Sequence, residues 1–213
     1  MSAVNSATLL HQALWPRDGA ALWIKRAVLF AAGIAALWIS ARVQIASVPV
    51  PVTMQVLVVM VIGAAYGARL GLATLLGYLA LGAAGYPVFA GTPEKGIGWL
   101  YMLGPTGGYL LGFALAAFVV GTLAERGWDR SPLAMAGAMA IGLLCIYVPG
   151  VAWLCSGFGL LGGALFEGAF AGFGWENWYA YGVKTFIWVD ALKLTLAVML
   201  FPAIWRLIGG SRG

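Results

Sequence analysis

The chain has 213 residues, of which 62% are hydrophobic and only 9% are charged, with a formal net charge of +5. A soluble domain carries roughly 25% charged residues, so this composition excludes an ordinary soluble protein and is typical of an integral membrane protein. The 12 basic residues are scattered in ones and twos between apolar blocks. Because no basic patch could follow a phosphate backbone, we exclude a nucleic-acid partner and expect membrane lipid instead.

Apolar segments along the chain predict an all-α integral membrane protein, a bundle of about six transmembrane helices. Residues 1–21 are expected to form a polar lead without a cleavable signal pattern, residues 22–208 a single membrane domain, and residues 209–213 a short tail. The only histidine, His11, has no partners at ligand spacing and is expected at the surface. The predicted spans are about 22–41, 54–66, 70–85, 110–123, 133–154 and 185–205.

Small residues recur at helical spacing along the first predicted span. Such rows let two helices approach closely in lipid, where packing drives association. Two interpretations stay open, namely contact with a separate subunit and packing within the bundle. The rows are Ala27, Ala31 and Ala35, and Ala32, Ala36 and Ser40.

Two connecting segments are rich in residues typical of binding loops. Prolines at positions 49 and 51 forbid helix in Val43–Thr53 and predict an extended segment. The longer Tyr86–Tyr109 segment mixes glycines, which let a backbone approach a ligand, with aromatic rings. It has no phosphate-binding motif, and its alternative interpretation is an interfacial aromatic belt. Its candidate ligand contacts are Phe89, Trp99, Gly107, Gly108 and Tyr109.

The later part of the chain holds fewer signals. Cys145 and Cys155, if on one helix, lie about 15 Å apart along its axis, which is beyond disulfide reach. Residues 156–184 are rich in glycine and aromatics, and the sequence leaves open whether they form an interfacial helix or part of a vestibule.

Two charges interrupt the last predicted span, Thr185–Trp205. Asp190 and Lys193 are three residues apart and so share one helix face. Each charge near the centre of a spanning helix costs about 2.5 to 3.5 kcal/mol on insertion scales, so such residues usually pair or face a cavity. Intramembrane ionisable groups are candidate functional sites, and the alternative is a purely structural ion pair.

The distribution of basic residues predicts the orientation of the bundle. With the N-terminus in the cytoplasm, only Arg42, Lys95 and Lys184 among the assigned residues lie outside. The loop between the first two spans, the loop between the third and fourth, and the start of the last helix then converge on the outer side. We expect an extracytoplasmic vestibule there for a small molecule. The residues assigned to the inside are Arg17, Lys25, Arg26, Arg69, Arg126, Arg130, Arg206 and Arg212.

Four stretches of the chain closely resemble one family. They are VPVPVTMQVLVV (48–59), LGYLALGAAGYPVFAG (76–91), LGPTGGYLLGF (103–113) and VDALK (189–193). These stretches are similar to the BioY biotin transport proteins, the substrate-binding S components of energy-coupling factor transporters. The resemblance implies high-affinity biotin binding and uptake at the bacterial cytoplasmic membrane, with both termini cytoplasmic. It also implies a separate transmembrane coupling subunit and ATPase subunits, with biotin as ligand and no cofactor.

The resemblance assigns Asp190 and Lys193 to the biotin site, and the chemistry of biotin suits them. A carboxylate accepts hydrogen bonds from ureido N–H groups, and an ammonium donates to a carbonyl or carboxylate oxygen. Thr53 and Gln55 are expected to add hydrogen bonds. The sequence departs from the family pattern just before Asp190, where it has Thr185-Phe186-Ile187-Trp188-Val189, and the segment before the last span is longer.

Two other functions remain as alternatives. One is the same fold carrying a different vitamin, such as thiamine or riboflavin, since pocket detail decides the ligand. The other is an intramembrane enzyme that uses Asp190 as acid or base. The sequence offers no nucleophile, metal cluster or second acidic partner for Asp190, so we expect no enzymatic activity and no metal.

Overall fold

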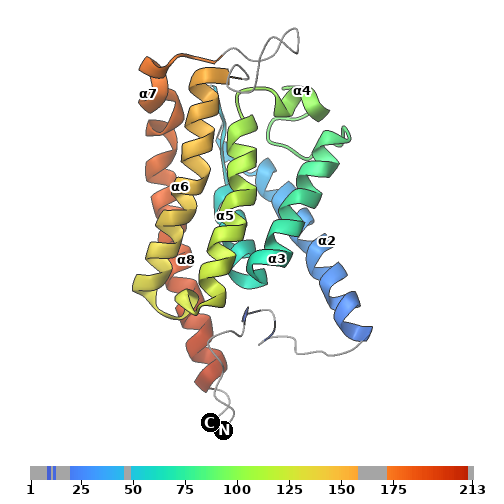
Figure 1. Ribbon diagram of the computed structural model, residues 1–213, viewed down its shortest axis with the longest axis vertical. Coiled ribbons are helices and arrows are strands. Elements are labelled where there is room, and N and C mark those ends of the chain that lie inside the picture. The colour runs from blue at the N-terminus through green and yellow to red at the C-terminus, as the bar shows by residue number, and fades with distance from the viewer. Residues whose placement is uncertain (1–8, 11, 13–19, 46–48, 158–171, 211–213) are drawn as a thin grey trace.

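The computed structural model describes residues 9, 10, 12, 20–45, 49–157 and 172–210, and these form an all-α bundle. His11 lies outside the described residues. Five described helices are long and apolar enough to cross a membrane. The elements, drawn in Figure 1, are α2 (Ala20–Arg42), β1 (Gln44–Ile45), β2 (Val52–Thr53), α3 (Gln55–Ala83), α4 (Gly98–Met102), α5 (Gly107–Glu125), η1 (Trp128–Arg130), α6 (Pro132–Ser156), η4 (Trp175–Asn177), α7 (Trp178–Gly182) and α8 (Lys184–Gly210).

Helix α3 is folded back on itself at Gly67, so it supplies two of the predicted segments. Gly67 has φ +82° and ψ 177°, a conformation open to glycine and outside the helical region. A Cβ atom on Gly71 would lie only 3.4 Å from the Cα of Gly63, and Gln55 is hydrogen-bonded to Tyr78. These contacts pair the two arms in antiparallel fashion, as the predicted turn between the second and third spans requires.

The two arms of α3 pack closely against α5 because glycines let the backbones meet. A Cβ atom at Gly63 would lie 2.8 Å from the carbonyl oxygen of Ala117, and one at Gly121 would lie 2.5 Å from the amide nitrogen of Ala68. Both distances are shorter than real Cβ contacts, so a larger residue would push the helices apart. Glycine at these positions therefore fixes the separation between α3 and α5.

Helix α6 packs on the other side of α5 by the same means. A Cβ atom at Gly112 would lie 2.7 Å from the Cα of Ile146. The predicted loop through Tyr109 is wrong at its end, because α5 begins at Gly107. The first turn of α5 packs against α6, where a Cβ atom at Gly108 would lie 2.4 Å from the carbonyl oxygen of Pro149. Gly108 therefore serves helix packing.

The bundle has two distinct ends, visible in Figure 1. At the end called here the terminal end, α2 begins and α8 finishes, and the bend of α3 and the turn from α5 to α6 lie at this end too. At the opposite end, called the loop end, lie α4 and α7. The extended segment predicted for Val43–Thr53 leads from α2 back into the bundle, with Gln44 and Ile45 paired antiparallel to Thr53 and Val52. Residues 46–48 lie outside the described residues.

A buried acid fastens the terminal end. Asp129 in η1 is fully buried, and its Oδ2 accepts a 2.5 Å hydrogen bond from Nε1 of Trp205 in α8. The guanidinium of Arg130 lies 4.6 Å from the centre of the Trp205 ring. Burial raises the pKa of Asp129 above its ordinary value, against the opposing effects of the Trp205 hydrogen bond and the Arg130 charge. The contact ties α8 to the turn between α5 and α6.

Replacing Gly121 with alanine tests the close packing of α3 on α5. The new methyl group would overlap the Gly67–Ala68 backbone, and overpacking of this kind costs about 1 to 3 kcal/mol. We expect a clear fall in the thermal unfolding temperature of Gly121→Ala in detergent. Gly137→Ala is the matched control, since its methyl group would meet only the Trp128 side chain, at 3.3 Å. Equal unfolding temperatures for both variants would contradict this account of the interface.

Candidate ligand-binding site

Helix α8 carries Asp190 and Lys193 into the interior of the bundle. Asp190 is 1% exposed and Lys193 is 4% exposed, so both charges are out of contact with solvent and lipid. Their side chains form an ion pair in which Nζ lies 2.7 Å from Oδ1. The spacing of three residues places both on the inward face of α8, as the sequence predicts.

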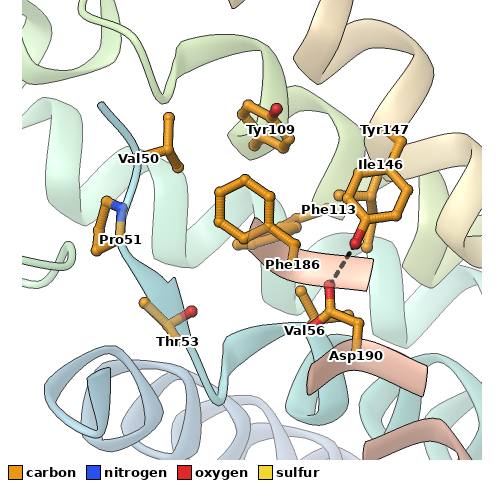
Figure 2. A pocket seen from close by; sticks show the side chains of 10 residues that line it. All are labelled: Val50, Pro51, Thr53, Val56, Tyr109, Phe113, Ile146, Tyr147, Phe186 and Asp190. Atoms are coloured by element: carbon orange, nitrogen blue, oxygen red, sulfur yellow. Dashed lines mark hydrogen bonds between the residues drawn. The ribbon is translucent and has the colours of Figure 1, made fainter. Parts of the chain in front are cut away.

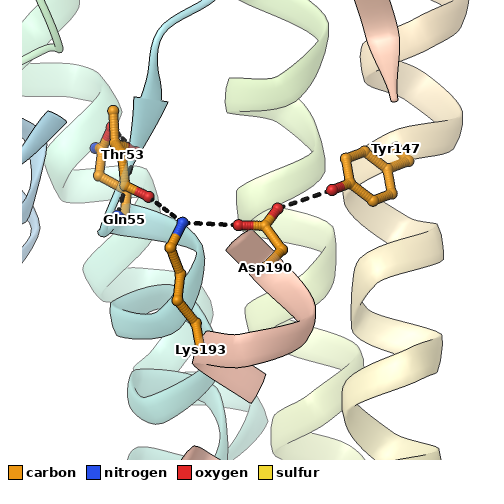
Figure 3. A network of polar contacts seen from close by, with 5 residues as sticks. All are labelled: Thr53, Gln55, Tyr147, Asp190 and Lys193. Carbon is orange, nitrogen blue, oxygen red and sulfur yellow. Dashed lines mark hydrogen bonds and ion pairs between the residues drawn. The ribbon is translucent and has the colours of Figure 1, made fainter. Parts of the chain in front are cut away.

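Two other elements complete the pair, as Figure 3 shows. The hydroxyl of Tyr147 in α6 donates to the second oxygen of Asp190 at 2.8 Å. Lys193 also donates to the backbone carbonyl of Thr53 at 2.6 Å. A buried charge is tolerated only when paired and hydrogen-bonded, and these contacts satisfy that condition for both groups. The ion pair therefore joins α8 to α6 and to β2.

The pair borders small cavities. One, of about 40 Å³, is lined by Asp190 and contains the contact between Tyr147 and Asp190 at its edge (Figure 2). A second cavity of about 40 Å³ reaches Gln55, and a third of about 170 Å³ reaches Lys193. Thr53 lines all three. The first is lined by Val50, Pro51, Thr53, Val56, Tyr109, Phe113, Ile146, Tyr147, Phe186 and Asp190.

Aromatic and aliphatic side chains form most of the first cavity wall, with polar groups at one side. Phe186 lies one turn before Asp190 on α8, and its ring centre is 5.9 Å from that of Tyr109. Tyr109 is held by its hydroxyl, which donates to the carbonyl of Gly182 at 2.9 Å. Flat apolar walls with a few fixed polar groups are typical of small-molecule sites.

Gln55 and Thr53 belong to a hydrogen-bonded network at the start of α3. The Thr53 hydroxyl accepts from the Gln55 backbone N–H at 3.2 Å, and Nε2 of Gln55 donates to the Tyr78 hydroxyl at 2.8 Å. Tyr78 in turn donates to the carbonyl of Val88. The network holds the Gln55 side chain at the second cavity and links the two arms of α3 to the loop that follows them.

The loop between α3 and α5 contributes differently from what the sequence predicts. Phe89 is 1% exposed and stacks on Tyr101 at 4.9 Å, so it supports the second cavity from behind instead of lining it. Trp99 is 66% exposed and lies by another, open cavity, outside all three spaces at the pair. Gly107 packs against Trp153 of α6. Of the five loop residues predicted as contacts, Tyr109 lines the cavities.

Tyr101 is a lining residue that the sequence analysis did not single out as a contact. Its hydroxyl donates to the carbonyl of Ala90 at 2.8 Å, and both residues line the second cavity. Burial raises the pKa of Tyr101 above its ordinary value, against the opposing hydrogen bond of Thr106. The phenol therefore stays neutral and remains a donor throughout the physiological pH range.

Tyr147 and Phe186 were also absent from the predicted site. Both left a signal in the sequence. Tyr147 is the only hydroxyl-bearing residue in the apolar stretch 133–154, and a buried hydroxyl in a span needs a partner. Phe186 precedes Asp190 by four residues, which places it on the same helix face.

The arrangement offers hydrogen-bond donors and acceptors beside apolar walls. Within the described part of the chain, two acceptors meet Lys193 Nζ, so one of its three N–H groups can serve a ligand. Each oxygen of Asp190 accepts one hydrogen bond and has capacity for another. Among residues that the structure describes, no three His, Cys, Asp or Glu side chains gather as metal ligands.

The family model and the similar proteins described here all carry the name BioY. Residues 10–210 match the model of the BioY family. The chain is 35% identical to a probable biotin transporter BioY of Pyrococcus horikoshii, over 83% of this chain and 93% of that protein. It is 34% identical to a biotin transporter BioY of Thermotoga maritima, with 83% of this chain and 91% of that protein covered. A biotin transporter BioY of Rhizobium etli is also 34% identical, over 83% and 89% of the two chains.

One solved structure has the same fold. It is the S-component for biotin from an ECF-type ABC transporter, and it superposes with a TM-score of 0.65. The match covers 89% of this chain and 95% of the other at 20% identity. The six-segment bundle expected from the sequence is thereby confirmed as a known membrane architecture.

Removing one charge of the pair should destabilise the protein far more than removing both. Asp190→Asn leaves the Lys193 ammonium buried without its carboxylate, and breaking a buried pair in this way costs about 3 to 5 kcal/mol. The double variant, with Asp190→Asn and Lys193→Met, leaves no buried charge and should unfold near the wild-type temperature in detergent. A double variant as unstable as the single one would show that the pair is needed for folding itself.

Proposed function

The chain belongs to the BioY family, and from this premise we propose that it binds biotin as the substrate-specific component of an energy-coupling factor transporter. It is a multi-pass membrane protein. The observation that carries the proposal is the buried pair of Asp190 and Lys193 at the edge of the cavities.

The site supplies groups that match both parts of the ligand. Asp190 can accept from ureido N–H groups, and Lys193 can donate to a carbonyl or carboxylate oxygen. Thr53 and Gln55 add polar atoms at the neighbouring cavity. Tyr109, Phe113 and Phe186 supply flat apolar contact for the sulfur-containing ring.

For biotin to bind, the residues that line the cavity beside Asp190 have to move apart. Sites for drug-sized ligands are about 300 to 1,000 Å³, and the cavity beside Asp190 has about 40 Å³. The extended segment at Val50 and Pro51 forms one wall and is tied to α8 through the hydrogen bond from Lys193 to Thr53. We propose that outward movement of this segment opens the site, because it lies outside the glycine-packed helices.

We propose that both termini face the cytoplasm and that the site opens outward. The basic residues support this orientation, because positive charges favour the cytoplasmic side. Arg69 lies near the bend of α3, Arg126 and Arg130 lie in the turn between α5 and α6, and Arg206 lies near the end of α8, all at the terminal end. The cavities then lie toward the extracytoplasmic side, from which a scavenged vitamin arrives.

The exposed alanines of α2 support the proposal that a separate coupling subunit packs against this helix. Ala27, Ala31, Ala32 and Ala35 are exposed, whereas Gly33 and Leu37 face the bundle. A Cβ atom at Gly33 would lie 2.6 Å from the Thr74 side chain of α3. The second row is divided, because Ala36 is half-buried and Ser40 is buried, so its later part packs inside the bundle. Only 17% of the most apolar stretch of α2 is buried, so the exposed alanines are open to contact with another helix, beside large exposed side chains such as Trp23 and Ile39.

The double variant Asp190→Asn with Lys193→Met tests the ligand role of the pair. If the pair binds biotin, the variant loses charge-assisted hydrogen bonds worth about 1.5 to 3 kcal/mol each. A total loss of about 3 kcal/mol lowers affinity more than a hundredfold. Equilibrium binding of labelled biotin to the purified protein, with thiamine and riboflavin as competitors, measures both affinity and specificity.

Leu192→Ala is the matched control, because this neighbour on α8 is 66% exposed and points away from the pair. Wild-type affinity in a folded, monodisperse double variant would remove Asp190 and Lys193 from the site. Displacement of biotin by another vitamin would reassign the ligand while leaving the pair in place.

Bulky residues in the alanine rows should weaken assembly with the coupling subunit. We expect Ala32→Leu to reduce copurification of that subunit several-fold while biotin affinity stays unchanged, since Ala32 is exposed and remote from the cavities. Ala191→Leu on α8 is the matched control at another exposed alanine. Undiminished copurification of the Ala32 variant would leave this row facing lipid.

A further inference from the structure

Aromatic residues are concentrated at the loop end, in the segment from Phe173 to Trp188. Seven of these sixteen residues are Phe, Trp or Tyr, which is far above the 13% share of aromatic residues in the whole chain. Only two are charged, Glu176 and Lys184. The segment includes η4, α7 and the first turn of α8, and it follows directly after residues 158–171, which are not described.

Most of these rings point away from the protein. Trp175 is 58% exposed, Trp178 49%, Tyr179 51% and Trp188 80%. Within the described residues, the indole N–H groups of the three tryptophans donate to no protein acceptor. Each ring therefore presents an apolar body and a polar tip to whatever surrounds the loop end.

The exposed rings continue the lipid-facing surface of α8. Trp188, Leu192, Leu196 and Met199 recur at spacings of four and three residues, which places them on one face. They are 80%, 66%, 55% and 66% exposed. Because α8 is long and apolar enough to span a membrane, Leu192, Leu196 and Met199 on this face lie in the hydrocarbon layer and Trp188 lies at its edge. Helix α7 lies just beyond the upper end of α8 (Figure 1).

We propose that the exposed rings of Phe173–Trp188 form a membrane anchor that lies in the lipid headgroup layer at the loop end. Tryptophan and tyrosine favour this layer because their rings contact acyl chains while the N–H or O–H reaches water and headgroups. The proposal answers the question the sequence leaves open for this part of the chain. It holds whichever ligand the cavities bind.

A lipid surface fits these observations better than a protein partner. The rings lie at the upper end of the exposed apolar face of α8, with Lys184 and Thr185 exposed between them and Trp188. Indole N–H groups that meet no acceptor among the described residues suit the mixed polarity of headgroups. Anchoring would also steady the site, since the Gly182 carbonyl at the end of α7 accepts the hydrogen bond from Tyr109. Tyr109 lines two of the cavities.

Fluorescence quenching in phosphatidylcholine vesicles tests the anchor on the full chain. Lipids brominated near the headgroup quench shallow tryptophans, lipids brominated near the chain ends quench deep ones, and iodide quenches those in water. We expect Trp175→Phe with Trp178→Phe to lose part of the shallow quenching and none of the iodide quenching. The loss is measurable because two of ten tryptophans are removed. Trp153→Phe is the control, since Trp153 is 7% exposed and inside the bundle.

Two outcomes would overturn the anchor. Loss of iodide quenching in the double variant, with shallow quenching kept, would place the segment in water. No change with any quencher would mean that another protein or a second copy covers the rings. The single variants Trp175→Phe and Trp178→Phe are measured in parallel, so that misfolding of the double variant leaves the test intact.

Discussion

The ion pair of Asp190 and Lys193 constrains which elements must meet around α8. Two charges inside an apolar bundle persist only if every polar atom finds a partner, and α8 alone cannot supply them. Tyr147 and the Thr53 carbonyl must therefore converge on α8 from two other elements. If Thr53 were inside a helix, its carbonyl would accept an intrahelical hydrogen bond. Because the prolines keep this segment extended, the carbonyl is available to accept from Lys193.

Glycine packing decides where those converging elements can lie. The close approach of α3, α5 and α6 brings Tyr109, Ile146 and Tyr147 to one wall of the cavity, facing Phe186 on α8. In lipid no water is expelled when helices meet, so contact between backbones does much of the work of association. The result is a helical wall on one side of the site and a buried extended segment on the other.

The exteriors of α2 and α8 differ in their small residues. Helix α2 exposes four alanines beside large side chains such as Trp23 and Ile39, whereas α8 exposes mainly large side chains such as Trp188 and Met199, which suit lipid. The interior face of α8 carries the ion pair beside the cavities, its exterior is apolar and exposed, and the segment before it is rich in exposed aromatics. The proposed ligand site and the proposed anchor are linked, because Gly182 accepts the hydrogen bond from Tyr109 and Phe186 lines the cavity. The exposed alanines of α2 lie on a separate surface.

The sequence by itself determined the membrane class, the apolar segments with the turn at Gly67, and the candidate pair on α8. These follow from composition, from the hydropathy of continuous segments and from spacing on one helix, which are local properties. Only the tertiary structure decided that Tyr147 completes the pair, that Trp99 lies outside the cavities and that Gly107 and Gly108 serve packing in α5. Those outcomes depend on which helix faces meet, and residues far apart in sequence set that geometry jointly through close contacts between backbones.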